Sequence, residues 1–290
     1  MTFEKFVEEM ICEIQELLGE DYVVSKKRVE KNNNVVKEGV GIRRKDSNLE
    51  ACMYLDLAYA GAYVYEGRVI EEIAKTLVRN YKESEKHNIV DVNQIMDWEW
   101  SKNRLRAKLI NTGRNKSVLE KSPHRQFLDL SIVYYVVVNE EEEAFMQVRN
   151  EQLSYWGKTE EDLYYQAMQN IQTEEELIIE DLQDVLQHHD IEGKEARGKC
   201  IMCTNSNKIF GAIMITWERS LQKLKEKLGS DEFIVLPSSV HEVLAVPLNE
   251  KSEWKGLKEI VKDVNDTLVD QEEVLGDSLY LYKNGRLEIW

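Results

Sequence analysis

Proline and glycine are scarce in this chain of 290 residues, which contains only 3 prolines and 14 glycines. Flexible linkers between domains are rich in glycine, serine or proline, so a long linker is not expected. Cysteine is scarce as well, and the four thiols are scattered through a chain long enough to build its own core: Cys12, Cys52, Cys200 and Cys203. This usage argues against a disulfide framework and predicts reduced thiols in a cytoplasmic protein.

Long apolar runs are also missing. The most apolar stretch, LDLSIVYYVVV, is bracketed by polar residues and is shorter than the roughly 18 residues that a membrane-spanning helix needs. The first residues, MTFEKFVEEMICEIQELLG, carry acids throughout and lack the basic start and uninterrupted apolar core of a signal peptide. We therefore expect no association with a membrane.

Positive charge is the third deficit. The chain has 38 Lys and Arg against 54 Asp and Glu, a formal net charge of −16 at pH 7. Such a charge repels nucleic acid and anionic membranes, so nucleic acid is disfavoured as a partner unless a local basic patch opposes the overall field. With 42% hydrophobic and 32% charged residues, the composition is that of a globular chain rather than a disordered one.

What is present is a regular alternation of strand and helix patterns. Apolar residues at helical spacing predict helices over residues 3–18, from Val69 onward and over 91–110. After about residue 127 the order strand, strand, helix occurs three times. Hairpins followed by helices favour antiparallel or mixed sheets with helices packed on them, which predicts the α+β class.

Local signals place some element boundaries. The spacing of Thr159 to Asp162, and of Thr173 to Glu176, predicts two helix starts, because each is a capping box. The apolar runs KCIMCT and KIFGAIMIT, on either side of polar turn residues, predict a hairpin over 199–216.

The domain organisation is predicted as an N-terminal region, residues 1–126, and a C-terminal region, residues 127–290. No change of composition marks the boundary, so a single domain is the alternative.

The stretch VLPSSVHEVLAVPL, residues 235–248, holds the most suggestive polar cluster: Ser238, Ser239, His241 and Glu242. Hydroxyl, imidazole and carboxylate are the groups of hydrolytic sites. A serine nucleophile needs a glycine-flanked elbow, and a zinc protease needs a second histidine where Ala245 stands. A proline followed by serines suits a turn, so the pattern favours a structural bend.

One stretch, residues 102–125, is locally basic, and on a helix Arg104 and Lys108 would share a face. With Arg125 they form a candidate anion-binding face, and the neighbouring His124 is counted as a further candidate member of the polar cluster of Ser238, Ser239, His241 and Glu242. The alternative is a solvated face that pairs with acids elsewhere in an acidic protein. Asp129 follows between two leucines, and an acid buried there would need a partner, for which Arg125 and His124 are the nearest choices.

Three other short patterns give weaker signals of a functional site. Cys200 and Cys203, three residues apart on a strand, would point to opposite faces and are interpreted as buried structural thiols. His188-His189-Asp190 ends an acidic helix, where adjacent histidines favour the helix dipole over a shared metal. Gly39-Val40-Gly41 lacks the third glycine of a dinucleotide-binding turn. No cofactor and no metal are predicted.

Several segments carry a resemblance to a known family: ACMYLDLAYAGAYVYEGRVIEEIAKTLVRNY, LINTGRNKSVLEKSPHRQFLDLSIVYYVVV, NEQLSYWGKTEEDLYYQAMQN, LPSSVHEVLAVP and EEVLGDSLYLY. Together they resemble a bacterial domain family of unknown function, common in gut Firmicutes and their mobile elements. One departure is Ala51-Cys52, where relatives often carry a proline before the Tyr-Leu-Asp strand. The resemblance covers nearly the whole chain and implies a bacterial cytoplasmic protein; it implies no catalytic residue.

Two functions follow as hypotheses. The first is a non-enzymatic protein-interaction module whose acidic surface engages a protein partner. The alternative is a hydrolase or nucleic-acid-processing enzyme that uses His241, Glu242 or His124 near the basic face. The acidic charge and the incomplete catalytic patterns favour the first.

Overall fold

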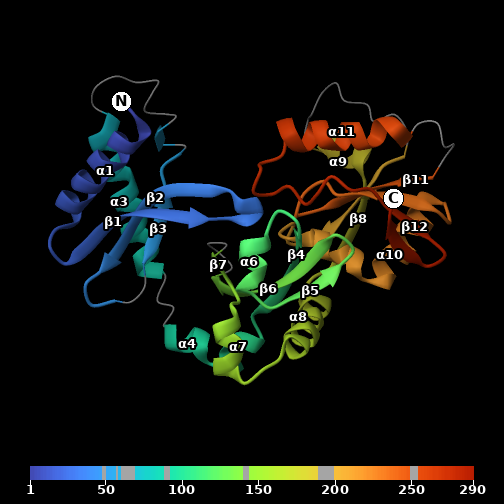
Figure 1. Ribbon diagram of the computed structural model, residues 1–290, viewed down its shortest axis with the longest axis horizontal. Helices are drawn as coiled ribbons and strands as arrows, with labels where there is room; N and C mark the ends of the chain where they lie inside the picture. The colour runs from blue at the N-terminus through green and yellow to red at the C-terminus, as the bar shows by residue number, and fades with distance from the viewer. Residues whose placement is uncertain are drawn as a thin grey trace. The chain divides into compact units, whose positions relative to one another are not determined.

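The computed structural model describes residues 1–47, 50–56, 58–59, 69–87, 92–139, 144–188, 199–248 and 254–290 (Figure 1). The chain divides into two compact units, unit 1 over Met1–Ile95 and unit 2 over Met96–Trp290. The expected division at residue 126 falls inside a strand, His124–Phe127, that is paired within unit 2. Among the described residues, no helix is long and apolar enough to cross a membrane.

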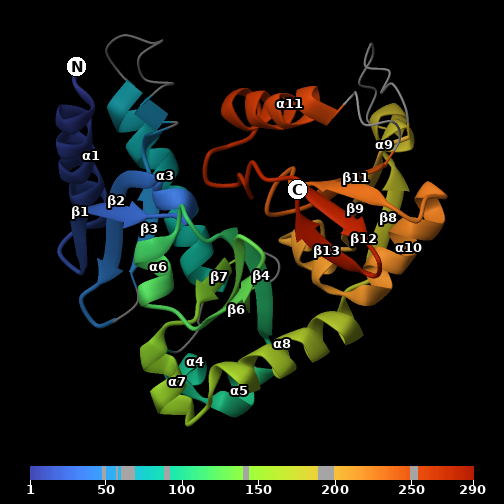
Figure 2. The same cartoon turned by 45° about the vertical axis from the view of Figure 1, so that its right-hand side comes forward.

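In the described part of unit 1, helices α1 and α3 pack on a three-stranded antiparallel sheet in the order β1-β2-β3. Its elements are α1 (Phe3–Leu18), β1 (Tyr22–Glu30), η1 (Asn32–Asn34), β2 (Val36–Arg44), β3 (Ala51–Tyr54) and α3 (Val69–His87). The apolar side chains of α1, among them Phe6, Met10 and Ile14, are fully buried against the sheet and α3. Both views show α1 and α3 side by side (Figures 1 and 2). The helix predicted over residues 3–18 is confirmed.

Unit 2 contains two further antiparallel sheets. The first half of the unit comprises α4 (Val92–Met96, which begins in unit 1), α5 (Trp98–Lys102), β4 (Leu105–Asn111), α6 (Lys116–Glu120), β5 (His124–Phe127), β6 (Leu130–Asn139), β7 (Ala144–Gln147), α7 (Asn150–Trp156) and α8 (Glu160–Glu174). Strand β6 is the centre of this sheet, with β4 on one side and β5 and β7 on the other.

The second half builds a six-stranded sheet in the order β13-β12-β10-β11-β9-β8. Its elements are β8 (Leu177–Asp181), α9 (Leu182–His188), β9 (Ile201–Asn205), η2 (Gly211–Thr216), α10 (Glu218–Leu228), β10 (Phe233–Leu236), β11 (Val243–Pro247), α11 (Trp254–Thr267), β12 (Tyr280–Lys283) and β13 (Arg286–Ile289). Alternate residues of β10 face opposite layers, because Phe233 joins the core that includes α10 whereas Ile234 packs with residues of α11. Every strand pair described is antiparallel, so the predicted α+β class is confirmed.

Three local predictions are wrong, for identifiable reasons. Residues 105–111 form β4 rather than the end of a helix, because their apolar side chains alternate and fill a sheet core. Thr173 lies in the last turn of α8, where its hydroxyl bonds back to the carbonyls of Gln169 and Asn170 instead of starting a helix. The hairpin expected over 199–216 stops at β9, since Gly211–Thr216 forms the 3₁₀ helix η2.

Asp129 ties the two sheets of unit 2 together. Its carboxylate accepts hydrogen bonds from the Ser278 hydroxyl at 2.6 Å and the Tyr280 hydroxyl at 2.8 Å. The partners expected from the sequence, Arg125 and His124, are therefore wrong for this acid. Arg125 instead binds Glu160 at the start of α8, and tertiary contacts far apart in the chain decide both pairings.

The start of α8 gives a direct test of local stability. Thr159 Oγ1 accepts from the Asp162 amide at 3.2 Å and Asp162 Oδ2 accepts from the Thr159 amide at 2.9 Å, which confirms the capping box. We expect Thr159→Ala to lower the free energy of unfolding of unit 2 by about 1 kcal/mol, whereas Thr159→Ser retains most of it.

The measurement is urea unfolding followed by tryptophan fluorescence. All six tryptophans lie in unit 2, so the signal reports that unit alone: Trp98, Trp100, Trp156, Trp217, Trp254 and Trp290. Equal stability of the alanine and serine variants would contradict the capping role.

Candidate functional site

The polar cluster between β10 and β11 forms the bend that the sequence favours. The Glu242 carboxylate accepts hydrogen bonds from the Ser238 hydroxyl at 3.0 Å and the Ser239 hydroxyl at 2.8 Å. The Ser239 hydroxyl in turn accepts from the backbone amide of His241 at 3.0 Å. These contacts close a turn within five residues, and none of them joins a serine hydroxyl to the imidazole.

His241 faces a different segment. Its Nδ1 accepts from the backbone amide of Phe210 at 3.3 Å, and its ring stacks on the Phe210 ring with centroids 5.5 Å apart. A ring nitrogen that accepts from an amide carries no proton, so the proton of the neutral imidazole lies on Nε2. That nitrogen is 3.6 Å from a carboxylate oxygen of Glu273.

The segment that His241 contacts, residues 205–210, is the connection between β9 and η2 and is called the 205–210 loop below. The Asn205 side chain closes it, donating to the Ile209 carbonyl at 2.8 Å and accepting from the Ile209 amide at 3.2 Å. Lys208 and Phe210 adopt the left-handed conformation, with φ of 56° and 54°, which costs roughly 1 kcal/mol or more for each non-glycine residue. Backbone strain of this kind concentrates at functional sites.

Gly211 ends the loop because no side chain fits there. A Cβ atom at this position would lie 2.2 Å from Thr204 Oγ1 and 2.6 Å from the His241 carbonyl oxygen. The backbone of the loop therefore approaches β9 and the His241 bend too closely for any other residue.

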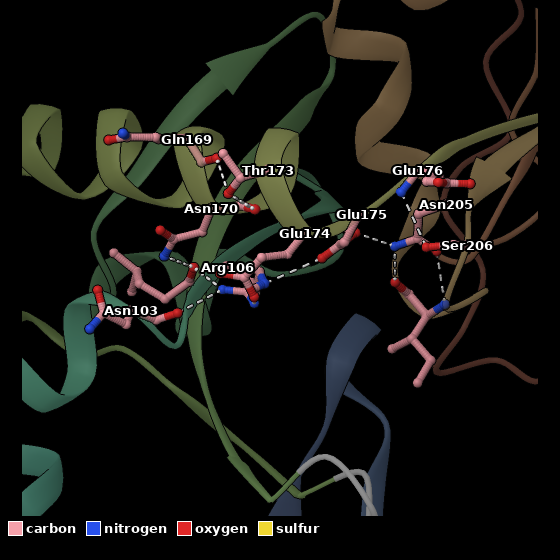
Figure 3. Close-up of polar contacts among 12 residues, drawn as sticks. Asn103, Arg106, Gln169, Asn170, Thr173, Glu174, Glu175, Glu176, Asn205 and Ser206 are labelled. Carbon is pink, nitrogen blue, oxygen red and sulfur yellow. Dashed lines mark hydrogen bonds and ion pairs between the residues drawn. The ribbon is translucent and has the colours of Figure 1, made fainter.

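A buried charge network holds the other side of the loop (Figure 3). Glu175, whose side chain is 5% exposed, accepts from Asn205 Nδ2 at 2.6 Å and lies 3.3 Å from Arg106 Nε. Arg106 comes from β4; it also pairs with Glu174 and donates to two backbone carbonyls, those of Asn103 and Leu105. Burial raises the pKa of Glu175 even though Asn205 and Arg106 act in the opposite direction.

The 205–210 loop separates two cavities. The His241 cavity has a volume of about 560 Å³, is open to solvent and is lined by the following residues: Asn207, Lys208, Ile209, Ser239, His241, Glu242, Leu268, Val269, Asp270 and Glu273. The Glu175 cavity is smaller, about 250 Å³, and is lined by the following residues: Arg106, Tyr135, Val137, Phe145, Glu175, Asn207 and Ile209. Asn207 and Ile209 belong to both, so the loop forms a shared wall.

The residues of the predicted basic face do not form one face. Arg104 lies in a turn and covers the ring of Trp100, 4.2 Å from its centroid. Lys108 lies on β4 with its ammonium 4.2 Å from the centroid of Phe210. Arg125 binds the Glu160 carboxylate through two nitrogens, at 3.0 and 3.2 Å.

The strand registers explain this separation. Lys108 and His124 both pair with Val133, from opposite sides of β6, so they share one sheet face. Arg125, one residue further, points to the opposite face and meets α8. The Nδ1 atom of His124 contacts the Ser122 carbonyl oxygen at 2.9 Å, and His124 is not among the residues that line the His241 cavity.

Of the two cysteines interpreted as buried structural thiols, Cys203 is buried and Cys200 is half-buried. Burial raises the pKa of Cys200 to about 11 and that of Cys203 to about 12, so neither is a thiolate near neutral pH. Among the described residues, no three His, Cys, Asp or Glu side chains are placed to hold a metal ion. His189 and Asp190 lie outside the described residues, as does the side chain of His188.

Sequence reasoning missed Arg106, Glu175 and Asn205 as site residues. Arg106 and Lys108 alternate with apolar residues in LRAKLIN, which is the strand period and places both on one face. No comparable signal marks Glu175, because it stands in a run of three glutamates and only the fold buries the middle one.

Fold and site together define an α+β protein with an acidic, two-cavity site in its larger unit. The chain belongs to a family of unknown function, DUF5688, which matches residues 3–284. Membership over nearly the whole chain confirms the resemblance to a family of unknown function, while a bacterial source stays a prediction. No curated protein and no solved structure matches the chain.

The buried pair predicts a pH-dependent stability. Because the pKa of Glu175 is raised in the folded state, the native protein binds more protons than the unfolded chain between the unfolded value, 4.5, and the folded one. Its contribution to stability is therefore complete below pH 4.5 and is lost as the pH rises through the folded pKa.

Arg106→Gln should increase this dependence, because it removes the cation that partly offsets the burial. We expect a loss of about 3 kcal/mol in the free energy of unfolding at pH 7 and a smaller loss at pH 5, because the raised pKa of Glu175 favours its neutral form increasingly as the pH is lowered. Adding Glu175→Gln to that variant should restore stability at pH 7. Urea unfolding followed by tryptophan fluorescence checks both, and equal losses at the two pH values would show that no buried charge is left uncompensated.

Proposed function

We propose that this protein is a cytoplasmic, non-enzymatic protein-interaction module that binds a basic segment of a partner protein at the 205–210 loop. The observation that carries the proposal is the charge of the two cavities beside the loop. The His241 cavity gathers three carboxylates, Glu242, Asp270 and Glu273, around one ammonium, that of Lys208. Glu174 and Glu175 share one guanidinium on the other side.

The overall charge acts in the same direction. A formal net charge of −16 attracts basic partners over distances of about a Debye length and raises their association rate. It disfavours nucleic acid as the partner. The net charge of the whole chain and the charge of the residues that line the site thus both favour a basic partner.

The hydrogen bonds of the bend support a binding role over a catalytic one. The Ser238 and Ser239 hydroxyls both donate to Glu242, and the lone pair on His241 Nδ1 is occupied by the Phe210 amide. A serine nucleophile instead donates to the nitrogen of its general base. The same groups here hold the walls of a cavity in place.

A defined peptide tests the proposal. We expect a nine-residue lysine-rich peptide to bind with an affinity that falls as salt is added, and a glutamate-rich peptide of equal length not to bind. Asp270→Asn with Glu273→Gln should weaken the lysine-rich peptide about tenfold, equivalent to ~1.4 kcal/mol. Fluorescence anisotropy of the labelled peptide is the measurement.

The matched control is Glu8→Gln with Glu16→Gln, which changes the net charge equally through two exposed residues of α1 in unit 1. Its affinity should stay within about twofold of the unmodified protein, since a change of 0.4 kcal/mol or less is expected from screened charges. If both pairs of substitutions weakened peptide binding equally, the interaction would be a non-specific charge effect, and the proposed binding site would be overturned.

The hydrolase or nucleic-acid-processing alternative has one observation in its favour. His241 Nε2 faces the Glu273 carboxylate at 3.6 Å in a cavity open to solvent, and an imidazole oriented by a carboxylate is half of a general-base arrangement. Glu242 is occupied by the two serines and His124 does not line this cavity, so neither completes the arrangement.

Hydrolysis of p-nitrophenyl acetate and bis-p-nitrophenyl phosphate separates the two functions. The binding module predicts equal background rates for the unmodified protein and for His241→Gln, because no nucleophile is activated. A rate that exceeds background and is lost in His241→Gln would overturn the non-enzymatic proposal. Folding of the variant is verified by its tryptophan emission spectrum.

A further inference from the structure

The Glu175 cavity has the size of one side chain. Its volume of about 250 Å³ lies below the roughly 300–1,000 Å³ typical of small-molecule and cofactor sites. Most of its lining is apolar or aromatic, from Val137, Ile209, Tyr135 and Phe145, and its polar lining comes from Glu175, Arg106 and Asn207. A ligand that fits must therefore be slender, apolar along its length and polar at its tip.

The charge of the polar lining favours a cation. Arg106 already has four acceptors, two of them the carboxylates of Glu174 and Glu175. One guanidinium against two carboxylates leaves an excess negative charge, shared between the buried Glu175 and Glu174, which is half-exposed and does not line the cavity. An anion entering the cavity would meet that charge, whereas a cation would offset it.

Glu175 can still accept hydrogen bonds. One of its oxygens faces Arg106 Nε and the other accepts from Asn205, while an ionised carboxylate has about four lone-pair sites. The raised pKa of Glu175 is consistent with a negative charge that its present partners compensate only in part.

The positions at which Glu175 can still accept a hydrogen bond favour an ammonium over a guanidinium. A guanidinium binds best through two parallel bonds to both oxygens of a carboxylate, and both oxygens of Glu175 already have a partner in the protein. An ammonium is a compact charge that needs only one open direction. The Tyr135 and Phe145 rings add a favourable surface for a cation and its alkyl stem.

We infer that the Glu175 cavity receives the side chain of a lysine from the partner protein, with its ammonium on Glu175 and its methylenes between Val137, Phe145 and Ile209. The inference rests on the proposed function and names the group that is recognised. Asn205 connects it to the rest of the site, because the same carboxylate that meets the ammonium also holds the amide that closes the 205–210 loop.

The probe is n-pentylammonium, with n-pentanol as its neutral counterpart of equal length, titrated into the full chain and followed by two-dimensional amide NMR. We expect saturable shifts at Phe145 and Ile209 with the ammonium and at least tenfold weaker binding of the alcohol. Affinity for the ammonium should fall as the pH is lowered through the pKa of Glu175, because the protonated acid no longer attracts a cation.

Glu175→Gln keeps an acceptor for Asn205 and removes the charge, and it should reduce ammonium binding to the level of the alcohol. Val137→Phe fills the cavity without changing charge and should abolish binding of both probes. Glu226→Gln, at an exposed position of α10 in the same unit, is the matched control and should leave the affinity within about twofold, less than 0.5 kcal/mol. Equal binding of ammonium and alcohol, or of Glu175→Gln and the unmodified protein, would overturn the inference.

The two proposals fail in different ways. If the lysine-rich peptide binds but n-pentylammonium does not saturate at Phe145 and Ile209, the lysine receptor is overturned and the interaction module stands. If n-pentylammonium saturates and the peptide does not bind, the cavity selects ammonium but the proposed partner class is overturned. Loss of peptide affinity in Glu175→Gln, matched by loss of pentylammonium, supports both.

Discussion

The site depends on one buried ion pair, Arg106 with Glu175. Strand β4 provides the cation and the residues just after α8 provide the acid, so the pair fixes the end of that helix against the four-stranded sheet. Glu175 then holds Asn205, which closes the 205–210 loop of the six-stranded sheet. A charge buried in this way destabilises the protein when its partner is removed, which makes the pair a constraint on both sheets at once. The two cavities exist because the loop between them is held from this side and, through Phe210, by His241 from the other.

In this arrangement, hydrogen bonds hold the carboxylates of the site in fixed positions without fully neutralising their charge. The carboxylates of Glu242 and Glu175 are hydrogen-bonded by neighbouring side chains and serve as walls, and their charge is only partly offset. A site with fixed geometry and unbalanced charge loses little conformational entropy when a partner of opposite charge arrives. Under the proposed function, such a site selects its partner by electrostatic complementarity and size rather than by induced closure.

Local patterns in the sequence were sufficient where neighbouring residues decide the structure. The amphipathic helix over residues 3–18 and the bend around Ser239 both follow from periodicity and turn chemistry alone. The 205–210 loop did not follow, because the apolar run after it resembles a strand, whereas in the fold it forms a 3₁₀ helix whose first residue, Gly211, lies against Thr204. The candidate basic face failed for a related reason: positions four apart share a helix face, but the sheet places Lys108 beside Phe210 and leaves Arg104 in a turn.

The bonds that Asp129 makes with Ser278 and Tyr280 span 149 and 151 positions of the chain. A growing polypeptide acquires its residues in order. All strands of the sheet centred on β6 are therefore synthesised long before the two hydroxyl groups that bind Asp129. Until residues 278–280 are made, Asp129 has neither of these two partners, and the link that it makes between the two sheets of unit 2 cannot form. Contacts of such long range slow folding, and the final assembly of unit 2 is therefore an event that follows synthesis of β12 rather than one that proceeds strand by strand.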